Sequence, residues 1–140
     1  MLQVGMDVLQ QMAFAPLKGK RVGLFTNPSA VDAELVSTYQ RFVNADVNLV
    51  ALFAAEHGAF GRAADGELID NMVDPATDIP IRSVYGKQHR PSAAMLADLD
   101  VMVCDIQDIG VRYYTFQWTM THIIEACGEH GVPVIVLDRP

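Results

Sequence analysis

The chain has 140 residues, of which 51% are apolar, and this is enough to form one domain with a hydrophobic core of its own. Its 10 lysines and arginines against 17 aspartates and glutamates give a formal net charge of −7, which argues against nucleic acid as a partner because binding a polyanion depends on basic side chains. The longest apolar stretch, residues 49–55, is far shorter than the ~20 residues of a membrane-spanning helix.

The N-terminal residues 1–11 lack the basic start, apolar core and small-residue cleavage site of a signal peptide. We therefore expect one domain over residues 1–140 that has no membrane span. The missing leader pattern points to the cytoplasm, and export stays open if the N-terminus has been trimmed.

Five short apolar runs are predicted to be β-strands. Four of them are nearly continuous rather than alternating, which is typical of parallel strands that are covered on both faces. In chain order the runs span residues 21–26, 48–53, 80–84, 100–104 and 133–137.

Helical periodicity lies between these runs. Apolar residues recur at helical spacing over residues 35–43, with Asp32 placed as the N-cap, then over residues 92–99, and again over residues 116–127, where glycines follow. The alternation predicts an α/β fold with a doubly wound, mainly parallel sheet of about five strands and helices on both faces.

Residues 59–78 show no clear periodicity and are rich in glycine and aspartate. A connection of about twenty residues is long for a compact domain, and such loops are usually functional. We interpret this segment as a loop over a cleft.

Several familiar chemistries lack their sequence patterns. The chain contains no Gly-x-Gly-x-x-Gly after the first strand, no Gly-Lys-Ser/Thr, no Gly-x-Ser-x-Gly, no His-Glu-x-x-His and no Cys-x-x-Cys. Cys104 and Cys127 lie in apolar segments, where a buried free thiol is the expected state. We therefore expect no cofactor and no metal. The chemistry that remains is acid/base catalysis by carboxylates, which glycoside hydrolases use.

Polar side chains gather where the predicted strands end, and ligands of an open parallel sheet bind outside those carboxyl ends. These residues are Asn27, Glu56, His57, Asp105, Gln107, Asp108, Asp138 and Arg139. Each taken singly also fits a structural role: a turn residue, a helix cap, an ion-paired carboxylate or a buried imidazole. The Glu-His-Gly triplet of residues 56–58 recurs at 129–131, but that copy ends a helix and is expected on the surface at the opposite edge.

Ordered motifs across nearly the whole chain resemble the NamZ-type exo-β-N-acetylmuramidases of bacteria. The motifs are Gly-Lys-Arg-Val-Gly-Leu-Phe-Thr-Asn-Pro at 19–28, Leu-Phe-Ala-Ala-Glu-His-Gly at 52–58, Ser-Val-Tyr-Gly at 83–86, Asp-Ile-Gln-Asp-Ile-Gly-Val-Arg-Tyr-Tyr-Thr at 105–115 and Leu-Asp-Arg-Pro at 137–140. The resemblance implies a Rossmann-like N-terminal domain of a glycosidase. Such an enzyme releases N-acetylmuramic acid from the non-reducing end of peptidoglycan fragments in cell-wall turnover.

The resemblance also implies functional residues. The family's catalytic glutamate corresponds to Glu56, a general acid/base whose pKa is expected to be raised by the apolar strand behind it and by nearby carboxylates. Asp105 and Asp108 are candidates for the second carboxylate, and Arg112 is a candidate partner for the lactyl carboxylate of muramic acid. The expected sugar-binding residues are Asn27, His57, Gln107, Tyr114 and Asp138.

Two departures from the family pattern qualify these expectations. Ala54 and Ala55 stand where family members commonly have Gly-Pro. The family continues past Asp-Arg-Pro into a second domain, so residues 1–140 are expected to represent the N-terminal domain alone. A truncated N-terminal domain would present half of a sugar site and an apolar face that favours a homodimer.

Two other functions remain open from the residues alone. One is a Rossmann-like domain that acts on or binds a nucleotide or a phosphorylated sugar, although no phosphate-binding loop is found. The other is a sugar-binding or assembly module without catalytic activity.

Overall fold

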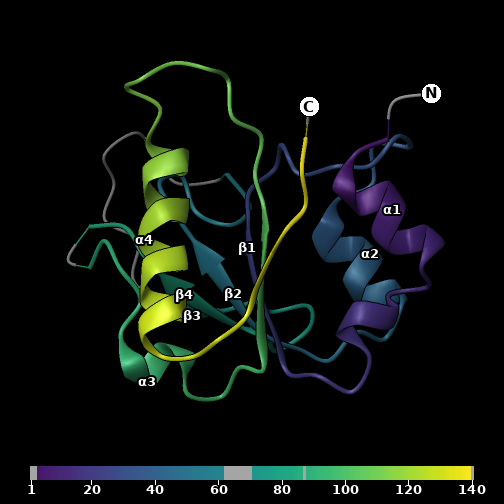
Figure 1. Ribbon diagram of the computed structural model, residues 1–140, viewed down its shortest axis with the longest axis horizontal. Coiled ribbons are helices and arrows are strands. Elements are labelled where there is room, and N and C mark those ends of the chain that lie inside the picture. The colour runs from purple at the N-terminus through teal and green to yellow at the C-terminus, as the bar shows by residue number, and fades with distance from the viewer. Residues whose placement is uncertain (1–2, 62–70, 87, 140) are drawn as a thin grey trace.

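A computed structural model describes residues 3–61, 71–86 and 88–139 of the chain (Figure 1). Six strands form one sheet in the order β3-β4-β2-β1-β5-β6, and every strand is parallel to its neighbours except β3, which is antiparallel to β4. The strands are β1 (Val22–Thr26), β2 (Leu49–Ala54), β3 (Met72–Val73), β4 (Pro80–Ser83), β5 (Val101–Asp105) and β6 (Val134–Val136).

The five parallel strands confirm the five predicted runs and the α/β class. Taken in chain order, they lie as third, second, first, fourth and fifth, which is the strand order of a Rossmann-type sheet. The order reverses between β1 and β5, whose ends are in register at Thr26 and Asp105. Ligands of such sheets bind at this reversal, outside the carboxyl ends of the strands.

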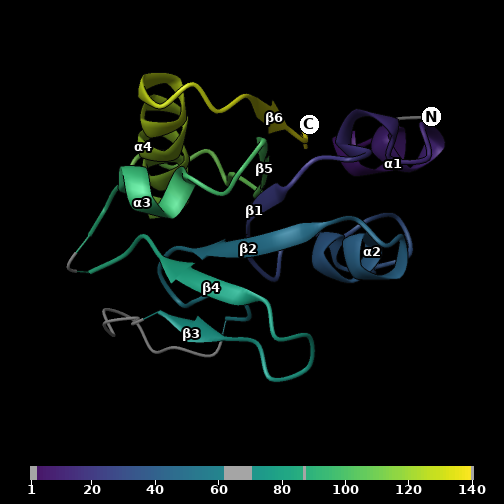
Figure 2. The same cartoon turned by 90° about the horizontal axis from the view of Figure 1, so that it is seen from below.

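Two helical layers cover the sheet, as predicted. Figure 2 shows α1 (Gly5–Gln11) and α2 (Thr38–Asn44) on one side of the strands, and α3 (Ala93–Leu96) and α4 (Thr115–Glu129) on the other. Alternate side chains of each strand supply the two apolar layers, so that Leu24 of β1 packs toward α1 and α2 while Phe25 packs toward α3 and α4. The doubly covered strands explain why their sequence runs are nearly continuous.

The α2 helix begins later than its periodicity predicts. Ser37 is its N-cap and accepts a hydrogen bond from the backbone N–H of Gln40 at 3.1 Å. The prediction of Asp32 as N-cap is wrong, because Asp32 accepts the N–H groups two and four residues later and holds a non-helical loop instead. Leu35, the first residue of the predicted stripe, lies in that loop with φ of +60° and is 80% exposed.

Three elements are absent from the sequence prediction, namely α1, β3 and a short 3₁₀ helix at Ala15–Leu17. The α1 helix is joined to the C-terminal segment by a hydrogen bond from Gly5 N to Asp138 O at 2.7 Å, and β3 is a two-residue edge strand that pairs with β4. Both are too short to show a clear period, so only their tertiary partners identify them. The predicted loop of residues 59–78 therefore contains a strand, and its residues 62–70 lie outside the described ranges.

The two cysteines are buried and free, as expected. Burial raises the pKa of the Cys127 thiol to about 11 and raises that of Cys104 as well, so both are held as unreactive thiols. Within the described residues, no helix is long and apolar enough to cross a membrane.

Candidate active site

Glu56 lies at the carboxyl edge of the sheet, two residues after the end of β2. A backbone hydrogen bond from Gly58 N to Ala55 O, 3.0 Å long, closes a tight turn that places Glu56 and His57 at its two central positions. Since β2 is a central buried strand, this turn is built on a rigid support. The half-buried side chains of both residues are thus held at the edge where ligands of parallel sheets bind.

Two hydroxyl groups hold the Glu56 carboxyl group. Tyr85 Oη donates to Oε1 at 2.9 Å, and Thr115 Oγ1 donates to Oε2 at 2.8 Å. Tyr85 follows β4 and Thr115 is the first residue of α4, so three separate elements converge on one carboxyl group. Each carboxyl oxygen therefore has a fixed direction, as an acid/base group requires.

Tyr85 and Thr115 are site residues that the sequence analysis did not select. The strand register explains why Tyr85 meets Glu56. Ala54 pairs with Ser83, and Glu56 and Tyr85 each follow two residues after these partners. Thr115 belongs to the motif at 105–115, but its contact with Glu56 spans 59 residues of sequence and depends on where α4 begins.

The backbone of His57 adopts a left-handed conformation with φ of +66°, which residues other than glycine rarely adopt. Such strained positions cluster at functional sites. We expect a His57→Gly variant to be more stable than His57→Ala by about 1 kcal/mol, since only alanine retains a Cβ that clashes in this region. Urea unfolding of the two variants measures the difference in the free energy of unfolding. Equal values would show that the backbone at position 57 is not strained.

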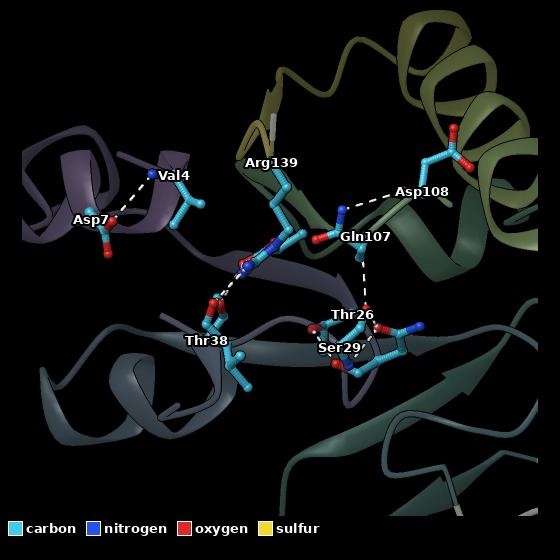
Figure 3. Close-up of polar contacts among 11 residues, drawn as sticks. Val4, Asp7, Thr26, Ser29, Thr38, Gln107, Asp108 and Arg139 are labelled. Carbon is cyan, nitrogen blue, oxygen red and sulfur yellow. Dashed lines mark hydrogen bonds and ion pairs between the residues drawn. The ribbon is translucent and has the colours of Figure 1, made fainter. Parts of the chain in front are cut away.

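Asp105 is fully buried at the end of β5 and is enclosed by donors. The Arg139 guanidinium binds both of its carboxylate oxygens, through Nε to Oδ1 and through Nη2 to Oδ2 at 2.8 Å, and Thr38 Oγ1 donates to Oδ2. Arg139 Nη1 also donates to Val31 O at 2.6 Å. Figure 3 shows Arg139 reaching from the C-terminal segment toward Thr38, so this ion pair joins β5, α2 and the chain after β6.

Asn27 and Gln107 meet at the reversal of strand order. Asn27 accepts hydrogen bonds from the N–H and the hydroxyl of Ser29, which folds the turn after β1. The Ser29 hydroxyl in turn accepts from the backbone N–H of Gln107 at 3.3 Å (Figure 3). Asn27 thus acts as a turn residue, which is the structural role that the sequence also allowed. Through Ser29 it links β1 to the connection after β5.

Asp108, Arg112 and Tyr114 lie on the connection from β5 to α4. The Asp108 carboxylate accepts the N–H of Gly110 at 3.2 Å, and the alternative pairing with Arg112 does not occur among the ion pairs of residues 3–61, 71–86 and 88–139. Asp108 and Arg112 are exposed, whereas Tyr114 is half-buried against Phe116. Both charged groups are therefore open to a ligand.

Asp138 lies apart from this group. Its side chain is exposed, and its carbonyl accepts the N–H of Gly5 at the start of α1. The second Glu-His-Gly copy is at the other end of α4, as predicted, where Glu129 forms an ion pair with Arg90. In the part of the chain that the structure describes, no three His, Cys, Asp or Glu side chains are grouped to hold a metal ion.

Comparisons with known proteins give one consistent result. Residues 22–140 match the protein family described as "Exo-beta-N-acetylmuramidase NamZ, N-terminal". The chain is 43% identical to the peptidoglycan β-N-acetylmuramidase NamZ of Bacillus subtilis (strain 168) over 99% of its own length and 34% of that protein.

Solved structures give the same answer for the fold. A DUF1343 family protein from Bacteroides fragilis superposes with a TM-score of 0.90 at 45% identity, and a second one superposes with a TM-score of 0.76 at 27% identity. The matches cover 99% of this chain but 34% and 35% of those chains. The chain thus spans about a third of the length of its relatives.

Proposed function

Because the chain belongs to the family of N-terminal domains of the exo-β-N-acetylmuramidase NamZ, we propose that it takes part in the hydrolysis of muramic acid glycosides from peptidoglycan, with Glu56 as general acid/base. The observation that carries this proposal is the Glu56 carboxyl group, held by Tyr85 and Thr115 at the carboxyl edge of the sheet. In its exo form, the reaction removes N-acetylmuramic acid from the non-reducing end of a fragment.

The proposed chemistry follows from that placement. Glu56 donates a proton to the glycosidic oxygen while positive charge develops at the anomeric carbon, and the bond to the leaving sugar breaks. Water then supplies the new hydroxyl group on muramic acid and gives its other proton to a carboxylate of the site, so that the proton lost by Glu56 is replaced. The Tyr85 and Thr115 hydroxyls keep the carboxyl group aimed at the leaving oxygen during this transfer.

We assign the second carboxylate to Asp108 rather than Asp105. Asp105 is fully buried and its charge is paired through both oxygens with the Arg139 guanidinium, so neither water nor a cationic sugar reaches it. Asp108 is exposed, and among the described residues its carboxylate accepts one hydrogen bond, from the N–H of Gly110 in its own loop. Asp105 then serves to position the strand ends around the site.

Recognition of the sugar is assigned to the connection after β5 and to the turns beside it. The Arg112 guanidinium is exposed and matches the lactyl carboxylate of muramic acid in charge and planar geometry. His57, Tyr114 and Gln107 offer hydrogen-bonding groups toward hydroxyl and acetamido substituents. Asn27 contributes indirectly, since its side-chain oxygen is engaged by Ser29.

Residues 1–140 act as one Rossmann-like domain in this proposal. In the relatives, two thirds of the length lies beyond the matched segment, and we infer that this part supplies the other side of the sugar site. A covering partner would shelter Glu56 from bulk solvent while leaving room for the sugar and the one water molecule that the hydrolysis consumes.

The test uses the chain alone and a chimera in which it replaces the matched segment of the Bacillus subtilis relative. We expect the folded chimera to release free N-acetylmuramic acid from a disaccharide that carries it at the non-reducing end, as measured by mass spectrometry. The 140-residue chain alone should release far less. A chimera that folds by circular dichroism yet releases no muramic acid would contradict the proposal.

A further inference from the structure

Two aromatic side chains are exposed close in the chain to Thr115, which contacts Glu56. Tyr113 is 83% exposed on the connection from β5 to α4, and Trp118 is 57% exposed on the first turn of α4. Figure 1 shows this connection arching over the end of the sheet from β5 to the start of α4.

The position of Trp118 is tied to the catalytic carboxyl group through α4. Thr115 contacts Glu56, and Trp118 follows three residues later, so the two are neighbours on the helix surface with Cβ atoms about 5–6 Å apart. Tyr113 precedes Thr115 by two residues.

The Trp118 ring is held in place before any ligand binds. The Trp118 indole N–H donates to Arg112 O at 3.3 Å, and Gln117 Nε2 donates to Val111 O at 3.3 Å. These bonds fasten the connection to the first turn of α4, while the faces of the rings remain open. A rigid aromatic surface loses little conformational entropy when it binds.

We propose that Tyr113 and Trp118 form a stacking surface for the pyranose ring of muramic acid, which rests on the function proposed above. The axial C–H groups of a pyranose carry partial positive charge and pack against the negative face of an aromatic ring. Arg112 lies between the two aromatic residues in the chain, and its exposed guanidinium adds selectivity for a ring that carries a carboxylate.

The chain contains one tryptophan, so its intrinsic fluorescence reports on Trp118 directly. We expect a muramic acid–glucosamine disaccharide, both sugars N-acetylated, to shift and quench this fluorescence in a saturable manner. Tyr113→Ala should weaken its binding about tenfold, which corresponds to ~1.4 kcal/mol. Arg112→Met should remove the preference for this ligand over N,N′-diacetylchitobiose, which lacks the carboxylate.

Ile124→Ala is the matched control, because Ile124 is an exposed apolar residue of the same helix on a different flank. This variant should bind the disaccharide with the affinity of the parent chain. The inference is overturned if millimolar disaccharide leaves the Trp118 fluorescence unchanged, or if Tyr113→Ala binds as tightly as the parent. Glu56→Gln should keep both the binding and the spectral shift. Hydrolysis that survives in Glu56→Gln would therefore refute the catalytic assignment and leave the stacking surface standing.

Discussion

Replacement of Glu56 by glutamine in the active chimera is expected to lower kcat/KM by about 10²- to 10⁴-fold, equivalent to ~3 to 5 kcal/mol of barrier. The amide has nearly the same shape as the carboxyl group. Its oxygen still accepts from one of the two hydroxyl groups and its NH2 group can donate to the other, but it has no acidic proton to give to the glycosidic oxygen. Because binding groups stay in place, the loss should fall on kcat more than on KM.

The chain offers a matched control for this experiment. Glu129 lies in the second copy of the Glu-His-Gly triplet, at the end of α4, where its exposed side chain pairs with the half-buried Arg90. Glu129→Gln removes only a surface ion pair and should retain activity close to that of the parent. Activity of Glu56→Gln within tenfold of Glu129→Gln would mean that another group transfers the proton.

Removal of single hydroxyl groups should have a smaller effect. Tyr85→Phe and Thr115→Val each delete one donor to Glu56 while leaving the carboxyl group, so the expected loss is roughly 3- to 10-fold for each. Comparison of their pH–rate profiles with that of the parent separates an altered carboxyl environment from a general loss of folding.

Replacement of Arg139 by methionine is expected to lower the free energy of unfolding by about 3–5 kcal/mol. The Asp105 side chain is fully buried and that of Arg139 is 6% exposed, so methionine leaves a buried carboxylate without its cation. The variant also loses the bond from Arg139 to Val31 O, which joins the C-terminal segment to the loop before α2. Urea denaturation followed by far-UV circular dichroism measures the change.

Arg21→Met is the comparison for burial. The Arg21–Asp100 pair has similar geometry, with an Nη2–Oδ1 distance of 2.8 Å, but its side chains are 47% and 40% exposed. Its loss should change stability by no more than about 1 kcal/mol, since solvent already screens the pair. Equal effects of Arg21→Met and Arg139→Met would show that burial does not strengthen the Asp105 pair.

A double variant distinguishes a lost ion pair from lost packing. When Asp105→Asn is added to Arg139→Met, no unpaired charge remains, and part of the stability should return. If the double variant is as unstable as the sum of the two single variants, the two side chains act independently.

The strand assignments were predictable because they depend on local composition. A strand covered on both faces must be apolar along its whole length, and this property is visible in the runs that became β1, β2, β4, β5 and β6. The same reasoning misses α1 and β3, since a seven-residue helix and a two-residue strand carry too few positions to show a period. It also misplaces the start of α2, because the Asp32 carboxylate accepts backbone N–H groups of a loop instead of capping the helix.

By itself, the sequence determined the layered α/β fold, the family and the placement of Glu56 after a buried strand. Only the tertiary structure decided which groups meet there. Tyr85 and Thr115 reach Glu56 across 29 and 59 residues, and Asp105 pairs with Arg139 across 34. Such contacts depend on the order of strands in the sheet and on where each helix begins. These are set by packing between distant segments, and no local pattern encodes them.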